Sequence, residues 1–223
     1  MPRSRSLDLL PPLRDRIKPG VRVLFVGINP GVRSAETGHH FAGYSNRFWK
    51  LLFAAGLVPE PIIHEDDDRL PEFGFGITNI CARATPGIDT LLPAEYVVGR
   101  LKLRRKILRY KPQVVAMVGV TVFRAMFPER KGPVTLGRQP EKIGDTAVFV
   151  LPNPSGRNAN VTHAEMLAAF RALKRYTSRA VARGQPSDVA TSWQCARVRP
   201  GIAHVATRDH VHRPAARGSR QRR

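Results

Sequence analysis

Apolar and polar positions along the first 180 residues follow two alternating patterns. Four short segments are almost continuously apolar, as is typical of strands buried on both faces of a parallel sheet. Longer segments between and after them carry apolar residues at helical spacing. The strands are expected at residues 21–26, 74–80, 113–119 and 146–152, and the helices at residues 44–56, 93–110, 121–127 and 162–177.

Strands that alternate with helices predict parallel crossover connections. The fold class expected is therefore α/β, a three-layer helix–sheet–helix domain with a central, mostly parallel four-stranded sheet. Ser45 is the predicted N-cap of the first helix. The helix at 93–110 is expected to have an apolar side and a dense Lys/Arg side.

Three segments are expected along the chain. Residues 1–18 form a flexible basic lead-in interrupted by prolines, and residues 19–178 form the folded domain. Residues 179–223 are rich in Arg, Ala, Gly and Pro and show no periodicity, which predicts a disordered tail. Two interpretations of that tail stay open: it binds DNA without sequence preference, or it has no role.

Charge indicates a polyanionic partner. The chain carries 37 Lys and Arg against 17 Asp and Glu, a net charge of +20. The tail holds ten arginines and two acids, so more than half of the net charge lies in the rest of the chain. Nucleic acid is the natural partner of such a protein. No apolar run is long enough for a membrane span or a signal peptide, and Cys81 and Cys195 have no metal or redox spacing. We therefore expect a cytoplasmic protein that associates with the nucleoid through DNA.

The segment GINPG, residues 27–31, directly follows the first apolar run. Parallel sheets place their sites at the carboxyl ends of their strands. A loop that only turns the chain needs Gly and Pro, but it does not need Asn29. The segment lacks the features of a P-loop and of GxGxxG. Two interpretations remain from these residues alone: a phosphate cradle, or a tight turn in which Asn29 tolerates an unusual backbone conformation.

Two further segments accompany that loop. NPSGRNAN, residues 153–160, follows the last apolar run and is expected at the same cleft. Two interpretations of this segment stay open. It is a narrow basic loop that inserts into DNA as a wedge, or it is a loop before a helix whose polar groups are hydrogen-bonded by its own Asn and Ser side chains. Phe41 either stacks on a planar base or belongs to the core. HEDDD, residues 64–68, has no ligand spacing, so we expect an acidic surface loop and no metal site.

Three stretches carry a family resemblance: VLFVGINPGVRSAETGHHFAGYSNRFWKLL, GFGITNICARAT and VFVLPNPSGRNAN. Over residues 19–176 the chain resembles the mismatch-specific uracil/thymine-DNA glycosylases of the uracil-DNA glycosylase superfamily. The resemblance implies an enzyme that flips a damaged or mispaired base out of the duplex and hydrolyses its N-glycosidic bond. It also implies roles for three groups of residues: Asn29 as the catalytic residue that holds the attacking water; Ile28, Phe41, Asn79 and Asn153 as the base pocket; and Ser155, Gly156, Arg157 and Asn158 as the wedge and backbone contacts.

Two positions differ from part of that family. Several bacterial relatives carry Leu where this chain has Arg157, whereas the animal thymine-DNA glycosylases carry Arg. Some relatives carry Lys where this chain has Asn79. The expected function is a monofunctional glycosylase for uracil opposite guanine, with thymine and etheno-cytosine as further candidate substrates. It is expected to act on double-stranded DNA as a monomer, without a metal or cofactor.

Three alternatives stay open. The chain is a glycosylase for another deaminated base such as hypoxanthine, a non-catalytic DNA-binding module on the same fold, or a phosphate-cradling nucleotide enzyme that uses GINPG. The preferred base and the role of the tail do not follow from the sequence.

Overall fold

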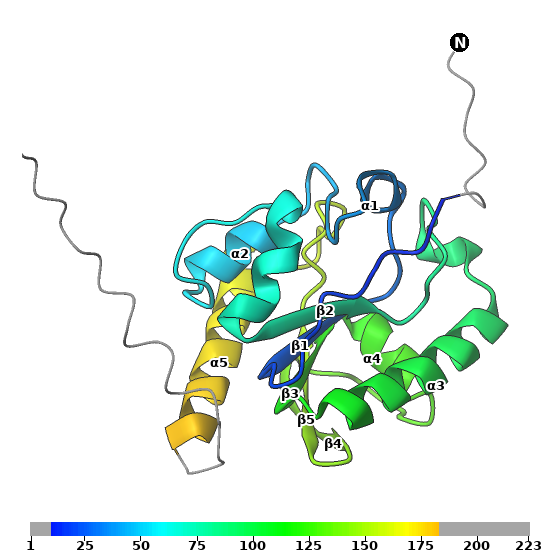
Figure 1. The fold of residues 1–223 in the computed structure, drawn as a ribbon. Coiled ribbons are helices and arrows are strands. Elements are labelled where there is room, and N and C mark those ends of the chain that lie inside the picture. The colour runs from blue at the N-terminus through cyan, green and yellow to red at the C-terminus, as the bar shows by residue number, and fades with distance from the viewer. Residues whose placement is uncertain (1–9, 183–223) are drawn as a thin grey trace, which may run out of the picture. The chain divides into compact units, whose positions relative to one another are not determined.

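The sheet has five strands in the order β2-β1-β3-β5-β4 (Figure 1). The computed structural model describes residues 10–182. Four strands are parallel to one another: β1 (Val23–Gly27), β2 (Phe75–Asn79), β3 (Val114–Val118) and β5 (Thr146–Leu151). These are the four strands expected from the apolar runs, so that prediction is confirmed.

The prediction of a four-stranded sheet is corrected by a fifth strand. Strand β4 (Gly137–Ile143) pairs antiparallel with β5 at the edge of the sheet. Its sequence, GRQPEKI, contains a proline and three charged residues and has no apolar run. Charged residues and proline are tolerated on edge strands because one side of the strand has no partner to pair with. Hydrophobic periodicity therefore could not reveal it.

Helices cover both faces of the sheet, which confirms the three-layer prediction (Figure 1). Phe25 points to the face covered by α2 (Phe48–Ala54) and α5 (His163–Ala182). Leu24 points to the opposite face, covered by α3 (Pro93–Tyr110) and α4 (Val120–Met126). Successive residues of each buried strand thus serve two separate cores.

The shorter elements were not predicted. They are α1 (Val32–Thr37) and the two 3₁₀ segments η2 (His64–Phe73) and η3 (Ile88–Thr90). The expected N-cap Ser45 is wrong, because α2 begins at Phe48 and its first N–H donates to Asn46 Oδ1 at 2.9 Å. Ser45 instead lies against Gly156, where any side chain would overlap it.

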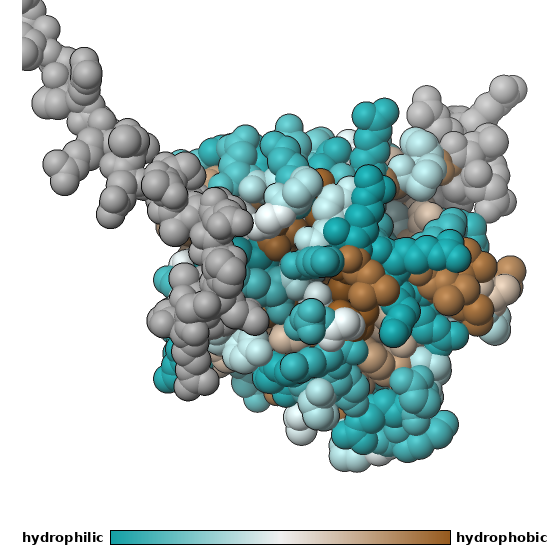
Figure 2. Space-filling view, turned by 60° about the horizontal axis from the view of Figure 1, so that its bottom comes forward, coloured by the Kyte–Doolittle hydropathy of each residue, from teal (hydrophilic) through white to brown (hydrophobic). Residues whose placement is uncertain are grey.

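Helix α3 departs from the expected division into an apolar and a basic side. Val97, Val98, Leu101 and Leu108 are exposed among its Lys and Arg residues. The view in Figure 2 shows separate hydrophobic patches on a surface that is mainly hydrophilic. No helix within residues 10–182 has the length and apolar character needed to cross a membrane.

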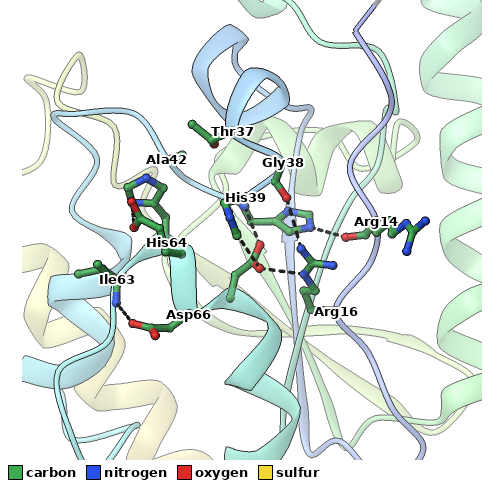
Figure 3. Close-up of polar contacts among 12 residues, drawn as sticks. Arg14, Arg16, Thr37, Gly38, His39, Ala42, Ile63, His64 and Asp66 are labelled. Carbon is green, nitrogen blue, oxygen red and sulfur yellow. Dashed lines mark hydrogen bonds and ion pairs between the residues drawn. The ribbon is translucent and has the colours of Figure 1, made fainter.

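HEDDD was expected to be an acidic surface loop, but it begins the 3₁₀ segment η2, in which Glu65 and Asp68 are exposed as expected and Asp67 is not. Its Asp67 is fully buried and accepts hydrogen bonds from Arg16 Nε at 2.8 Å and from the His40 N–H at 2.9 Å. Arg16 also pairs with Ile77 of β2 through its backbone (its side chain is seen in Figure 3). The end of the predicted lead-in therefore lies along the edge of the sheet. In the other direction, α5 continues to Ala182, and the rest of the Arg-rich tail lies outside the described residues.

Candidate active site

A cleft of about 970 Å³ opens at the carboxyl ends of the parallel strands. Strands β2 and β3 lie on opposite sides of β1, so the chain reverses its direction across the sheet at this point, where open α/β sheets bind their ligands. All the predicted site residues except Gly156 line this cleft: Ile28, Asn29, Phe41, Asn79, Asn153, Ser155, Arg157 and Asn158. The sequence therefore placed GINPG and NPSGRNAN correctly at one cleft.

The loops after β1 and β2 are joined by backbone hydrogen bonds. The Ile80 N–H donates to the Gly27 carbonyl at 3.0 Å, and the Cys81 N–H donates to the Ile28 carbonyl at 2.8 Å. The Thr85 N–H donates to the Pro30 carbonyl at 3.1 Å. These bonds extend the pairing of the two strands into the site. The backbone on both sides of Asn29 is therefore fixed by hydrogen bonds to residues 80–85.

The side-chain amide of Asn29 is fixed through its nitrogen. Nδ2 lies 3.1 Å from the Pro30 carbonyl, 3.0 Å from the Arg83 carbonyl and 2.7 Å from Thr85 Oγ1. The carbonyls can only accept hydrogen bonds, so the group facing them must be the NH₂. The Thr85 hydroxyl donates its own proton to the Gly87 carbonyl at 2.7 Å, which leaves its oxygen to accept from Asn29.

This anchoring leaves Asn29 Oδ1 in the cleft as an acceptor. Within residues 10–182 no donor reaches it. An amide oxygen is too weak a base to remove a proton from water, but it can accept one hydrogen bond from a water and so orient it. The arrangement can therefore position a nucleophilic water, and the leaving group must be activated by other means.

Phe41 serves both the core and the cleft. Its ring stacks on Phe48 with centroids 4.3 Å apart and planes at 24°. Its backbone has φ 52°, a left-handed conformation that is uncommon for a residue with a side chain and that tends to occur at functional sites. The two interpretations of Phe41 offered by the sequence are therefore compatible.

Gly27 lies against both Phe41 and Asn79. A Cβ on Gly27 would lie 3.3 Å from Phe41 Cζ and would overlap Asn79 Oδ1. Glycine at position 27 therefore lets Asn79 lie close to the backbone of β1. All three residues line the cleft, and we call the part of the cleft that they line the slot. The Phe41 ring has a flat face of the kind on which a planar base can stack.

The loop 153–160 is satisfied by its own side chains, as one interpretation expected. Asn153 Oδ1 accepts from the Ser155 N–H at 3.0 Å, and Asn158 Nδ2 donates to the Asn153 carbonyl at 2.9 Å. Arg157 is nevertheless exposed and reaches over the cleft, where Nη1 donates to the Pro86 carbonyl at 3.2 Å. The loop, which is stabilised by its own hydrogen bonds, thus presents the long cationic side chain of Arg157 at the cleft.

The other groups that could catalyse a reaction near this cleft are a bound metal, the Cys81 thiol and a carboxylate. No three His, Cys, Asp or Glu side chains are grouped as metal ligands within residues 10–182. Burial raises the pKa of the Cys81 thiol to about 11, so it is protonated at neutral pH and is a poor nucleophile. The one carboxylate that lines the described cleft is that of the exposed Asp89.

Sequence reasoning missed three residues that shape this site: Gly27, His40 and Thr85. His40 Nδ1 lies 3.4 Å from Asn79 Nδ2. Thr85 lies 56 positions from the Asn29 that it holds, and no local pattern marks such a contact. Gly27 was visible as a glycine after a buried strand, but its neighbours were not.

The comparison with protein families agrees with this geometry. Residues 15–174 match the model of the Uracil DNA glycosylase superfamily. The matched segment contains the whole sheet and every residue that lines the cleft except Leu13. The chain therefore belongs to the uracil-DNA glycosylase superfamily, and its activity is that of a DNA glycosylase, which hydrolyses the N-glycosidic bond of damaged bases in DNA.

Proposed function

We propose that the chain removes uracil opposite guanine from double-stranded DNA and leaves an abasic site. The observation that carries this proposal is the Asn29 amide, which lines the cleft and is anchored through Nδ2, so that Oδ1 is left to accept. The flipped base enters the slot and stacks on Phe41. Asn29 Oδ1 then holds a water against C1′ of the sugar.

The weakness of the Asn29 amide as a base determines how the barrier falls. The glycosidic bond must break largely before the water loses its proton, so negative charge develops on the uracil ring. We expect hydrogen-bond donors at the ends of the strands, with the backbone near Ile28 among them, to stabilise that charge. The reaction consumes one water and releases the free base.

The same residues support a monofunctional enzyme without a cofactor. No Lys lines the described cleft, so no amine is available there to form a Schiff base with the abasic sugar. All groups that the proposed steps require come from one chain, which supports action as a monomer. Arg157 is the proposed wedge, which enters the duplex where the base has left.

The proposal is tested with duplexes that carry uracil, thymine, etheno-cytosine or hypoxanthine opposite guanine. Single-turnover cleavage is measured for each at one enzyme concentration. We expect uracil to be released fastest. Fastest release of hypoxanthine would replace the proposed substrate with a deaminated purine, and tight binding without any cleavage would favour a non-catalytic module.

We predict that Thr85→Val lowers the single-turnover rate by about 10- to 100-fold, the size of effect that follows when a catalytic group loses its orientation. Valine has nearly the volume of threonine, but it removes the nearest of the three acceptors of Asn29 Nδ2. Thr90→Val is the matched control, because Thr90 also donates to the Gly87 carbonyl yet does not contact Asn29. Equal rates for the two variants would contradict the role of Thr85.

We predict that Arg157→Ala weakens binding to an abasic product duplex by about tenfold, with a smaller effect on the chemical step. The affinity for product is measured by fluorescence anisotropy at two salt concentrations. Arg124→Ala is the control: Arg124 also rests on a backbone carbonyl, that of Gly132 at 3.1 Å, and it does not line the cleft. Unchanged product affinity in Arg157→Ala would remove the wedge assignment.

A further inference from the structure

Helix α3 packs on the sheet through one face only. Gly99, Leu103 and Ile107 are the residues of this helix that are buried. A Cβ on Gly99 would overlap the carbonyl of Ile80, so the helix lies directly against the backbone that follows β2. A larger residue at position 99 would push the helix away from the sheet. The close contact therefore fixes which side of α3 faces inward.

Two polar anchors on the flank of α3 hold the same orientation. Lys106 Nζ donates to Thr78 Oγ1 of β2 at 2.7 Å. Near the start of the helix, Arg83 Nε donates to Glu95 Oε1 at 2.9 Å. The helix is thus fixed at both ends, and it cannot turn to bury its opposite side.

That opposite side carries a second apolar stripe. Val97 is 47 % exposed, Val98 50 %, Leu101 51 % and Leu108 44 %. With 3.6 residues per turn, these four positions lie within about 100° around the helix axis and span about 16 Å, or three turns. Single exposed apolar side chains are normal, but several on one face of one helix mark a contact surface. We call these four residues the α3 stripe.

Cations border and interrupt the α3 stripe. The helix holds six Lys and Arg residues and one acid, Glu95. Four of the cations are exposed and have no carboxylate partner within residues 10–182: Lys102, Arg104, Arg105 and Arg109. Arg104 lies three residues after Leu101 and four before Leu108, so it falls inside the stripe. The surface therefore combines apolar side chains with unpaired positive charge.

The α3 stripe is separate from the cleft. No residue of α3 is among the described residues that line the cleft. The helix covers the face of the sheet opposite to α2 and α5 (Figure 1). A partner bound to the stripe therefore needs none of the residues that the proposed reaction uses.

We propose that the α3 stripe docks an acidic amphipathic helix of a partner protein. Such a helix carries apolar residues at spacings of three and four over about three turns, with Asp or Glu beside them. Its apolar residues pack against Val97, Leu101 and Leu108. Its carboxylates pair with Arg104 and Arg105, for which planar, bidentate hydrogen bonding to a carboxylate is favourable. Charge complementarity together with the apolar stripe determines this choice of partner.

The chain itself does not supply a segment of this kind beyond the described residues. Residues 1–9 contain two Arg and one Asp, and residues 183–223 contain nine Arg and two Asp. Both segments have the same sign of charge as the α3 stripe. A second copy that paired through its own α3 would bring Arg104 and Arg105 against identical cations, which is unfavourable.

DNA and membranes fit the α3 stripe less well. The phosphates of DNA would pair with the cations but would leave the four aliphatic side chains without a partner. An interfacial membrane helix buries an apolar face that is rich in Trp, Phe and Leu and keeps its cations on the other side. Here Arg104 and Arg105 lie within the apolar face, and the stripe has no aromatic side chain.

The probe for this surface is a fluorescein-labelled synthetic helix of about 16 residues, with Leu at spacings of three and four and Glu elsewhere. One control peptide has the same composition in scrambled order, and another has Lys in place of every Glu. Their binding to the full-length chain is measured by fluorescence anisotropy at about 0.15 M salt, with and without saturating duplex DNA.

We expect the acidic amphipathic peptide to bind at least about tenfold more tightly than either control, and duplex DNA not to displace it. Leu101→Ser should weaken this binding by about tenfold or more, the scale of burying one leucine side chain. Ile63→Ser is the matched control, because Ile63 is 58 % exposed and lies on η2. Both variants should keep the wild-type thermal stability and rate of uracil release.

Reversal of charge separates recognition from general attraction to a basic protein. The double variant Arg104→Glu, Arg105→Glu should lose the acidic peptide and bind the Lys peptide instead. A purely structural role of the two arginines would not exchange the preference. Equal affinity of Leu101→Ser and wild type for the acidic peptide, or its displacement by duplex DNA, would overturn the inference.

Two further measurements decide between this partner and the other occupants. Vesicles of phosphatidylcholine and phosphatidylglycerol are sedimented with wild type and with Leu101→Ser, and the self-association of both proteins is measured by sedimentation velocity. We expect neither vesicle binding nor a dimer that depends on Leu101. Vesicle binding lost in Leu101→Ser would replace the peptide with a membrane, and a dimer lost in Leu101→Ser would replace it with a second copy.

Discussion

Asn29→Ala is expected to lower the single-turnover rate of uracil release by about 10³-fold, the upper range for loss of one preorganised group in an active site. The reason is geometric: Asn29 Oδ1 is the acceptor that the anchored amide leaves in the cleft. Alanine removes it together with the three hydrogen bonds of Nδ2. The rate is measured with enzyme in excess over a duplex that carries uracil opposite guanine.

Binding and stability provide the control for this variant. Asn29 is half-buried in a loop. The backbone of its neighbours is hydrogen-bonded to Ile80, Cys81 and Thr85, so the loop should keep its conformation in the variant. We expect the affinity for the duplex to change by less than about threefold, below the effect of one hydrogen bond in an interface. A variant with unchanged cleavage would show that Asn29 does not hold the water, and one with lost binding would assign it to DNA recognition.

Gly27→Ala is expected to lower uracil release by about 100-fold or more, because a misplaced group of atomic size is enough to remove the productive geometry. The added methyl group would overlap Asn79 Oδ1 and press against Phe41 at 3.3 Å from Cζ, so Asn79 would have to leave its position in the slot. The affinity of this variant for a duplex that carries a flipped base analogue should fall more than its affinity for undamaged duplex, because only a flipped base reaches the slot.

The same loop supplies a matched control for this substitution. Gly31 has an ordinary extended backbone, with φ −72° and ψ 163°, and a Cβ there would meet nothing within 4 Å. Gly31→Ala should therefore retain cleavage close to the wild-type rate. Equal activity of the two alanine variants would mean that the base does not occupy the slot. Thermal unfolding of each variant separates a blocked slot from a damaged fold.

Much of the fold could be predicted because the buried strands of a parallel sheet are continuous apolar runs. The four parallel strands were found in this way, and their alternation with helices indicated the layers. Strand β4 could not be found, because an edge strand needs only one partner and its polar sequence carries no such signal. Asp67 was misjudged for a related reason: the partners that make its burial tolerable come from distant segments.

The site was predictable where one residue type was unexpected in its local context. Asn29 stood out because a turn does not require it, and Arg157 stood out in a loop of small residues. Thr85 and His40 gave no such signal. Their importance comes from which end of a neighbouring amide they hold, and that depends on contacts across 56 and 39 positions of the chain.

The most direct test of the central claim is a single-turnover assay of the full-length chain on a duplex with one uracil opposite guanine. The released base and the state of the DNA strand are analysed together. The account predicts free uracil, an abasic site and a backbone that breaks only on later treatment with alkali. Retention of the uracil in a duplex that the protein binds tightly would contradict it.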